Sequence, residues 1–199
     1  MRIDVASSNP GKLREYRELA AGQAIQLDIV PGIAGVPPFD ETAPTFAENS
    51  AGKAIYYSRL SSELVIADDS GLVVPALGGA PGVRSARYAG PDASDADRVA
   101  KLLGEMRGRT GDERRARFVC VLTLAQDGRA IAVFSDTVEG TLGLEPRGAG
   151  GFGYDPIFYF EKLGKTYAEI PRELKNEYSH RGRAFRKLLK FLLSDETYI

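Results

Sequence analysis

The sequence predicts an α/β fold with a mixed β-sheet. Near the N-terminus, strand-like and helix-like segments alternate, which is typical of parallel pairing. In the middle of the chain, two apolar segments at 118–125 and 130–138 flank Gln126-Asp127-Gly128-Arg129, a pattern typical of an antiparallel hairpin. The chain has 199 residues, 43% hydrophobic and 27% charged, so it can bury a core as one domain.

The first sixty residues predict two strands and two helices. Strands are expected at 2–6 and 25–30, and the helix between them begins where Asn9 can cap it and Pro10 suits its first turn. The proline-rich stretch 31–44 predicts a loop. Thr45 and Glu48 form a capping-box pattern, which opens a second helix that continues to about residue 60.

The remaining elements follow from apolar spacing and glycine content. Strands at 65–69 and 72–74 are expected around a turn at 68–71, followed by an ordered loop at 78–90 and a helix at 95–106. The charged stretch 107–117 predicts an exposed loop, and 148–154 a glycine-rich one. A short strand at 156–160 and an amphipathic helix at 181–193 complete the prediction.

Charge and cysteine content restrict the function. Lys plus Arg number 26 and Asp plus Glu 27, a balance of −1 that argues against a general nucleic-acid binder. The single cysteine, Cys120, lies in an apolar segment and is expected in the core, without an intrachain disulfide. We identify neither a signal peptide nor a membrane span, so we expect a cytoplasmic protein without membrane partners.

Asp68 and Asp69 end a buried apolar run. Sheets of α/β proteins place ligand sites at the ends of their strands. Because adjacent carboxylates repel, the pair suits a hard cation such as Mg²⁺. The same residues followed by Ser70 and Gly71 also suit an ordinary turn, and pattern alone does not separate the two interpretations.

Two further segments carry candidate phosphate-binding lysines. Lys12 follows Ser7-Ser8-Asn9-Pro10-Gly11 at a predicted helix N-terminus, which favours anions, although this is not a Walker A loop. The alternative is a capped helix with a surface lysine. Lys53 shares a helix face with Asn49, and Glu41 precedes that helix as a candidate metal ligand; the alternative is a solvated face.

The C-terminal half adds an aromatic residue and donors. Phe152 lies among glycines in the 148–155 loop, where it suits a platform for a base; the alternative is a flexible hairpin connection. Lys175, His180 and Arg181 form a cluster of donors around the only histidine. No Ser/His/Asp or Cys/His pattern stands out, and a zinc site is not expected.

Together these segments resemble the inosine/xanthosine triphosphate pyrophosphatase family, whose members hydrolyse non-standard purine nucleoside triphosphates. The matching motifs occur in order over nearly the whole chain: Ser8-Asn9-Pro10-Gly11-Lys12, residues 45–53, Asp68-Asp69-Ser70-Gly71, residues 78–88, Gly151-Phe152-Gly153-Tyr154-Asp155-Pro156 and Ser179-His180-Arg181-Gly182. Departures are Ser7-Ser8, where Thr-Gly is common, and Ser50, where Ala is common.

The resemblance implies a single two-lobed domain over residues 1–199, with a long mixed sheet flooring a cleft between the lobes and helices on both sides. It implies a homodimer, Mg²⁺ dependence, and hydrolysis of ITP, dITP and XTP to monophosphate and pyrophosphate. Alternatives are a Maf-like pyrophosphatase for other nucleotides, a non-catalytic nucleotide sensor, or a metal phosphomonoesterase that releases orthophosphate.

We expect Asp69 to be the general base, Mg²⁺ to bind Glu41 and Asp69 with help from Asp68, and Lys12 and Lys53 to hold phosphates. Phe152 is expected to stack on the purine. The other expected substrate-binding residues are Ser7, Ser8, Asn9, Ser70, Gly153, Tyr154, Asp155, Lys175, His180 and Arg181.

Overall fold

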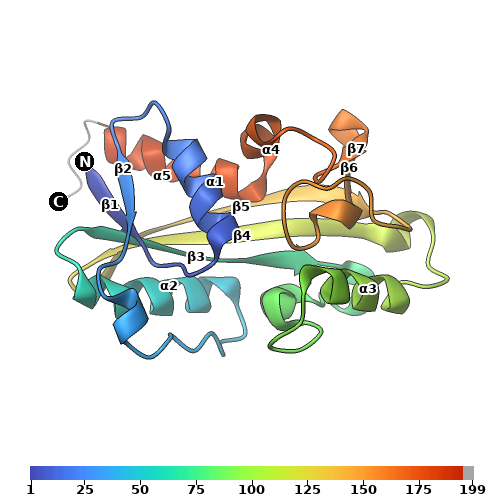
Figure 1. The fold of residues 1–199 in the computed structure, drawn as a ribbon, viewed down its shortest axis with the longest axis horizontal. Helices are drawn as coiled ribbons and strands as arrows, with labels where there is room; N and C mark the ends of the chain where they lie inside the picture. Colours follow the sequence, from blue (N-terminus) through green and yellow to red (C-terminus); the bar gives the residue numbers. More distant parts are fainter. Residues whose placement is uncertain (195–199) are drawn as a thin grey trace. The chain divides into compact units, whose positions relative to one another are not determined.

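A computed structural model describes residues 1–194 of the chain, which form an α/β fold around a mixed seven-stranded sheet (Figure 1). The strand order is β2-β1-β3-β4-β5-β6-β7. The strands are β1 (Arg2–Val5), β2 (Gln26–Ile29), β3 (Leu64–Val73), β4 (Arg115–Gln126), β5 (Arg129–Leu142), β6 (Phe158–Phe160) and β7 (Lys165–Thr166). β1 pairs in parallel with β2 and β3, whereas β6 pairs antiparallel with β5 and β7, so the predicted mixed sheet is confirmed.

The helices occupy most of the predicted positions. They are α1 (Pro10–Ala20), α2 (Phe46–Tyr57), α3 (Asp95–Glu105), α4 (Arg172–Tyr178) and α5 (His180–Leu193). Short 3₁₀ helices lie at Ile33–Gly35, Ser58–Leu60, Pro75–Leu77, Gly82–Arg87, Gly111–Arg114, Asp155–Ile157 and Glu161–Leu163. None of the helices in residues 1–194 is long and apolar enough to cross a membrane.

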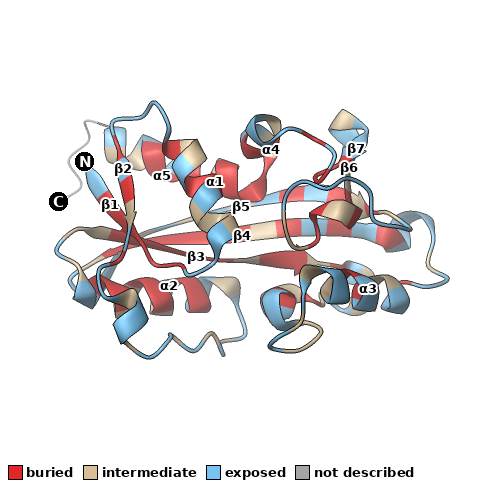
Figure 2. Cartoon of the chain, in the orientation of Figure 1, coloured by how far each residue is buried: buried red, intermediate tan, exposed pale blue. Residues whose placement is uncertain are grey.

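The chain divides into two compact units. Of the described residues, the first unit contains 1–69, 120–136 and 180–194; the second contains 70–119 and 137–179. In the first unit, α1 and α5 cover one face of the strands and α2 covers the other (Figure 1). Strands β1, β3 and β4 are largely buried, whereas β5 is mostly exposed or half-buried and the helices expose their outer sides (Figure 2).

Alternation along β3 assigns its side chains to these two faces. Ile66 packs in the core of α1 and α5, whereas Val65 and Ala67 pack in the core of α2. Successive side chains of a strand point to opposite faces. The next two residues of the strand therefore also separate, and this places the functional groups described below.

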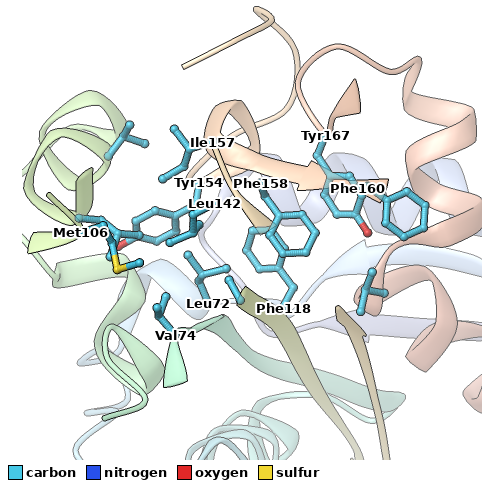
Figure 3. Packing of buried hydrophobic residues seen from close by; sticks show 14 of the residues in the cluster. Leu72, Val74, Met106, Phe118, Leu142, Tyr154, Ile157, Phe158, Phe160 and Tyr167 are labelled. Atoms are coloured by element: carbon cyan, nitrogen blue, oxygen red, sulfur yellow. The ribbon is translucent and has the colours of Figure 1, made fainter. Parts of the chain in front are cut away.

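The second unit has its own aromatic core (Figure 3). Phe158 lies 4.6 Å from Phe118 and 4.9 Å from Tyr167, measured between ring centroids. Val99 and Leu102 of α3 join the same core. This core gives a packed support to the glycine-rich segment that leads into β6.

The predicted turn at residues 68–71 is wrong, because β3 runs without interruption from Leu64 to Val73. A Cβ atom on Gly71 would lie 2.4 Å from Ser85 Oγ and 2.5 Å from the Gly82 carbonyl oxygen. Gly71 is thus present for a close approach by another segment within the second unit, and not for a turn.

The predicted exposed loop at 107–117 is also wrong in its second half. The Arg114 side chain is buried and donates to the carbonyl oxygens of Leu142, Gly143 and Met106 at 2.7, 2.6 and 3.1 Å. A charged residue enters the interior here because it satisfies backbone acceptors. β4 then begins at Arg115.

Other predictions hold with shifted ends. Asp127 and Gly128 have φ values of 49° and 75°, as a two-residue hairpin turn between twisted strands requires. Cys120 is buried, as predicted. β7 and α4 were not predicted.

Candidate functional site

Asp68 and Asp69 point to opposite faces of β3. Lys12 of α1 and Arg181 of α5 contact the Asp68 carboxylate, whereas Asn49 of α2 contacts the Asp69 carboxylate. Both residues belong to the first unit. The two carboxylates therefore have different hydrogen-bonding and ion-pairing partners.

Cations surround the Asp68 carboxylate, which is 1% exposed. Its Oδ2 lies 3.0 Å from Lys12 Nζ and 3.3 Å from Arg181 Nη2. Burial opposes ionisation, but the charges of Lys12, Arg181 and Lys53 outweigh it and hold the pKa of Asp68 well below its usual value. Asp68 is a permanent anion at neutral pH.

The Asp69 carboxylate has the opposite tendency. Its Oδ2 accepts a hydrogen bond of 3.0 Å from Asn49. Burial, followed by the negative charge of Glu41, raises the pKa of Asp69 to about 6. A carboxyl group with this pKa can both hold and release a proton near neutral pH, which suits a general base.

The lysines converge on the backbone of β3. Lys53 pairs with Glu41 and donates to the Asp68 carbonyl oxygen at 2.7 Å; Lys12 reaches that same oxygen at 3.4 Å. Burial disfavours the charge of Lys53, but Asp68 and Glu41 reverse that effect and raise its pKa. Both lysines are charged and partly buried, so the alternatives of a surface lysine and a solvated face are wrong.

Arg181 lies deep in the first unit. Its guanidinium is 2% exposed and bridges Asp68 to Glu15 of α1. The sequence predicts Arg181 as a substrate-binding residue, whereas its partner Glu15 is not among the predicted site residues. The spacing of three residues between Lys12 and Glu15 places them on one side of α1 and was the available signal.

The side chains before α1 cap the helix. Asn9 Oδ1 accepts from the backbone N–H groups of Gly11 and Lys12 at 2.9 and 3.2 Å, and Ser7 Oγ accepts from the Asn9 N–H at 3.2 Å. The prediction of a capped helix is confirmed. Ser8 is exposed.

In the second unit, Asp155 joins Phe152 to Lys175. Asp155 Oδ2 accepts from the Phe152 N–H at 2.9 Å and from Lys175 Nζ at 2.5 Å. Lys175 Nζ lies 4.9 Å from the centre of the Phe152 ring. Gly151 has a φ of +71°, and a Cβ there would lie 2.0 Å from Asp155 Oδ2, so glycine is required beside this contact.

The other expected residues have varied surroundings. The N–H of Gly153 donates to Asp95 of α3 at 2.7 Å. Tyr154 lies in the core of the second unit, and its hydroxyl donates to the Ser85 carbonyl oxygen at 2.9 Å. Ser70 is half-buried on β3, and His180 is buried in the first turn of α5.

The residues present fit a magnesium ion that binds few protein ligands. Among residues 1–194, no group of three or more His, Cys, Asp or Glu could hold a metal. However, Glu41 raises the pKa of Asp69 by repulsion, which a divalent cation would relieve. Mg²⁺ commonly uses one or two carboxylates together with substrate phosphates and waters. Asp68, which contacts two cations, fits this role less well than Asp69 and Glu41.

The fold and these groups define an α/β protein with carboxylates and lysines gathered at one strand. The chain belongs to the Ham1 family, whose model matches residues 3–191.

Two bacterial relatives illustrate the similarity. A protein of Geobacillus kaustophilus named dITP/XTP pyrophosphatase is 50% identical and covers 94% of this chain and 91% of its own length. A Thermus thermophilus protein of the same name is 49% identical, with coverages of 96% and 91%.

Solved structures agree on the fold. A HAM1 protein from Coxiella burnetii has a TM-score of 0.85 at 39% identity and covers 96% of this chain and 98% of its own. A nucleoside-triphosphatase / dITP/XTP pyrophosphatase from Mycobacterium abscessus has a TM-score of 0.71 at 36% identity, with coverages of 96% and 100%.

Proposed function

We propose that this protein hydrolyses non-standard purine nucleoside triphosphates, namely ITP, dITP and XTP, to the nucleoside monophosphate and pyrophosphate. The relatives named dITP/XTP pyrophosphatase, which match over nearly the whole chain, support this substrate class. The observation that carries the proposal is Asp69, a buried carboxyl group with a pKa of about 6, in the same unit as the buried Lys53 and the half-buried Lys12. Removal of these nucleotides from the cellular pool would be its role.

In this mechanism Asp69 accepts a proton from the attacking water. The water oxygen bonds to the α-phosphorus while the bond from that phosphorus to the bridging oxygen of the β-phosphate breaks, and pyrophosphate leaves. General base catalysis of this kind contributes about 10²–10⁴-fold to a rate. When bound by Glu41 and Asp69, Mg²⁺ would neutralise charge on the phosphates.

Lys12 and Lys53 supply fixed positive charge for the phosphates. Asp68 and Glu41 already hold both ammonium groups in defined positions. Side chains held before the substrate arrives lose less conformational entropy on binding. The anions that hold the lysines thus serve substrate binding as well as folding.

Base selection would rest on Phe152 and Lys175. Phe152 offers a face for stacking, and the position of Lys175 is set by Asp155. Hypoxanthine and xanthine present an acceptor at O6, which a lysine satisfies, whereas adenine presents an amino donor there. Because Asp155 keeps the charge of Lys175 paired, adenine would leave only one N–H of this lysine without an acceptor, which costs about 1–3 kcal/mol, or roughly 5- to 150-fold. His180 and Arg181 are further candidates for contacts to the base.

We also propose that the protein is a homodimer, as the resemblance implies, and that it acts in the cytoplasm. Light scattering of the purified full-length chain tests the dimer directly, since a monomer would have the chain mass of 21.5 kDa.

Product analysis tests the proposed activity. We expect monophosphate and pyrophosphate from ITP, dITP and XTP, little product from ATP and GTP, and none without Mg²⁺. Orthophosphate as the direct product would indicate a phosphomonoesterase and contradict attack at the α-phosphorus. Tight ITP binding without product would indicate a sensor, and a preference for pyrimidine or modified nucleotides would favour the Maf-like alternative.

A further inference from the structure

The side chain of Asn49 makes three hydrogen bonds beside the candidate base. Its side chain is 0% exposed. Its Nδ2 donates to Asp69 Oδ2 at 3.0 Å and to the Ala43 carbonyl oxygen at 3.2 Å, and its Oδ1 accepts from the Ala43 N–H at 3.0 Å. Both N–H groups of the amide are therefore used, and the contacts to Ala43 define which atom is nitrogen.

This amide joins two segments that carry candidate metal ligands. Ala43 lies two residues after Glu41 in the segment that leads into α2, and Asp69 lies on β3. Asn49 is one helical turn before Lys53, on the same face of α2. The Asn49 side chain thus hydrogen-bonds both to the segment that carries Glu41, through Ala43, and to the Asp69 carboxylate.

The helix that carries Asn49 is itself anchored. Ser50 Oγ donates to the Ala67 carbonyl oxygen at 3.0 Å and lies 2.8 Å from the Thr123 hydroxyl, and both atoms are buried. Contacts to β3 and β4 therefore fix the first turns of α2. A side chain on a fixed helix is a precise support for a catalytic group.

We propose that Asn49 is a positioning residue, which sets the orientation of the Asp69 carboxylate and its separation from Glu41. With Oδ2 held by a directed donor, the plane of the carboxylate is set before a cation or substrate arrives. This inference rests on the function proposed for Asp69. Outer partners of this kind typically change metal affinity or activity by about 10- to 100-fold when removed.

The test compares Asn49→Leu and Asn49→Ala with Tyr56→Phe. Leucine has a similar shape to asparagine and makes no hydrogen bonds, while alanine removes the side chain. Tyr56→Phe is the matched control, because the Tyr56 hydroxyl donates to the Pro37 carbonyl oxygen at 3.0 Å and so ties the same loop to α2 without touching Asp69.

The first measurement is direct binding of Mn²⁺ in the absence of nucleotide. We expect both Asn49 variants to bind Mn²⁺ about 10- to 100-fold more weakly than the wild type, and Tyr56→Phe to bind within about twofold of it. In steady-state assays with ITP, kcat should fall by a similar factor while KM changes by less than about threefold. A merely structural role would lower the melting temperature without this separation of kcat from KM.

Mn²⁺ affinity and kcat within twofold of the wild type in a folded Asn49→Leu protein would overturn the proposal. An equal loss in Tyr56→Phe would also overturn it, because loop tethering alone would then explain the effect. If neither Asn49 variant folds, NMR of the wild type decides: the Asn49 side-chain amide resonances should shift on addition of Mg²⁺ alone, and unchanged resonances at saturation reject the role.

Failure of the proposed function can be distinguished from failure of the proposal for Asn49. A wild-type protein that hydrolyses none of the nucleotides contradicts the activity, while the Mn²⁺ measurements still report on the geometry around Asp69.

Discussion

The two faces of β3 shift the pKa values of two adjacent carboxyl groups in opposite directions. On the face covered by α1 and α5, Asp68 contacts Lys12 and Arg181, and its pKa lies well below the usual value. On the face covered by α2, Asp69 has an amide and a neighbouring anion, and its pKa is raised to about 6. The strand's alternation makes one aspartate a structural anion and the other a titratable group.

The largest expected effect is that of Asp68→Asn. The variant leaves the buried Arg181 and the half-buried Lys12 without their shared anion, and the free energy of unfolding should fall by about 3–5 kcal/mol at pH 7. Because the folded-state pKa of Asp68 is lowered, its contribution is present above about pH 4 and is lost as the pH falls further. Urea denaturation at pH 7 and at pH 3.5 should therefore show a smaller difference at the lower pH.

Asp136→Asn is the control for that experiment. Asp136 pairs with Lys187 at 2.9 Å and with Arg183 at 3.8 Å; Lys187 is exposed and Arg183 is half-buried. Pairs of this kind contribute about 0–1 kcal/mol. An equal fall in the free energy of unfolding in both variants would contradict the conclusion that Asp68 stabilises the fold more than an exposed ion pair does.

Asp69→Asn should have the opposite effect on stability. Because the pKa of Asp69 rises from 3.8 to about 6, ionisation of Asp69 costs the folded state about 2–3 kcal/mol at pH 8. The asparagine variant avoids this cost and should melt at a higher temperature, with turnover reduced by about 10²–10⁴-fold. The gain in stability should vanish as the pH falls from 6 towards 4, because the wild-type group is then protonated. Near-normal kcat would remove Asp69 as the base.

Glu15→Gln is a smaller change on the face of β3 where Lys12 and Arg181 lie, and we expect a smaller loss of stability. Arg181 keeps a hydrogen-bond acceptor but loses one of its two anionic partners, and we expect a loss of about 1–2 kcal/mol at pH 7. Thermal melting measures the difference. A loss as large as that of Asp68→Asn would mean that Glu15, and not Asp68, is the main counter-ion of Arg181.

Glu41→Gln should give the smallest of these effects. It tests the face of β3 that α2 covers, where Asp69 lies. Removal of this negative charge should lower the pKa of Asp69 from about 6, because Glu41 is the second cause of its elevation after burial. NMR titration of the Asp69 carboxyl carbon in metal-free protein checks the direction. An unchanged pKa would assign the whole elevation to burial.

Local sequence patterns predicted much of the fold because the responsible interactions are local. Asn9 accepts hydrogen bonds from residues two and three positions later, and Thr45 caps α2 through Glu48. The turn between β4 and β5 has positive φ values at Asp127 and Gly128, residue types that suit this conformation. Such features require no information about distant parts of the chain.

The predictions that the structure contradicts failed because they depend on contacts between residues far apart in the chain. Asp-Asp-Ser-Gly has good turn chemistry, but contacts from Gly82 and Ser85 accompany a straight strand at Gly71. The sequence indicated that Asp68 and Asp69 were functional but not that their roles differ, because that difference depends on which helix covers each face. Glu15 lies 166 positions from Arg181 in the chain, so no local pattern connects them.

The unbroken course of β3 limits which changes in length this protein can accept. Deletion or insertion of one residue between Leu64 and Asp68 would exchange the faces of every later side chain in the strand. The base would then face Lys12 and Arg181, and the structural anion would face Glu41. An extra residue at the exposed hairpin around Asp127 and Gly128 would leave β3 in register, so natural length variation is expected at that hairpin and not within the strand.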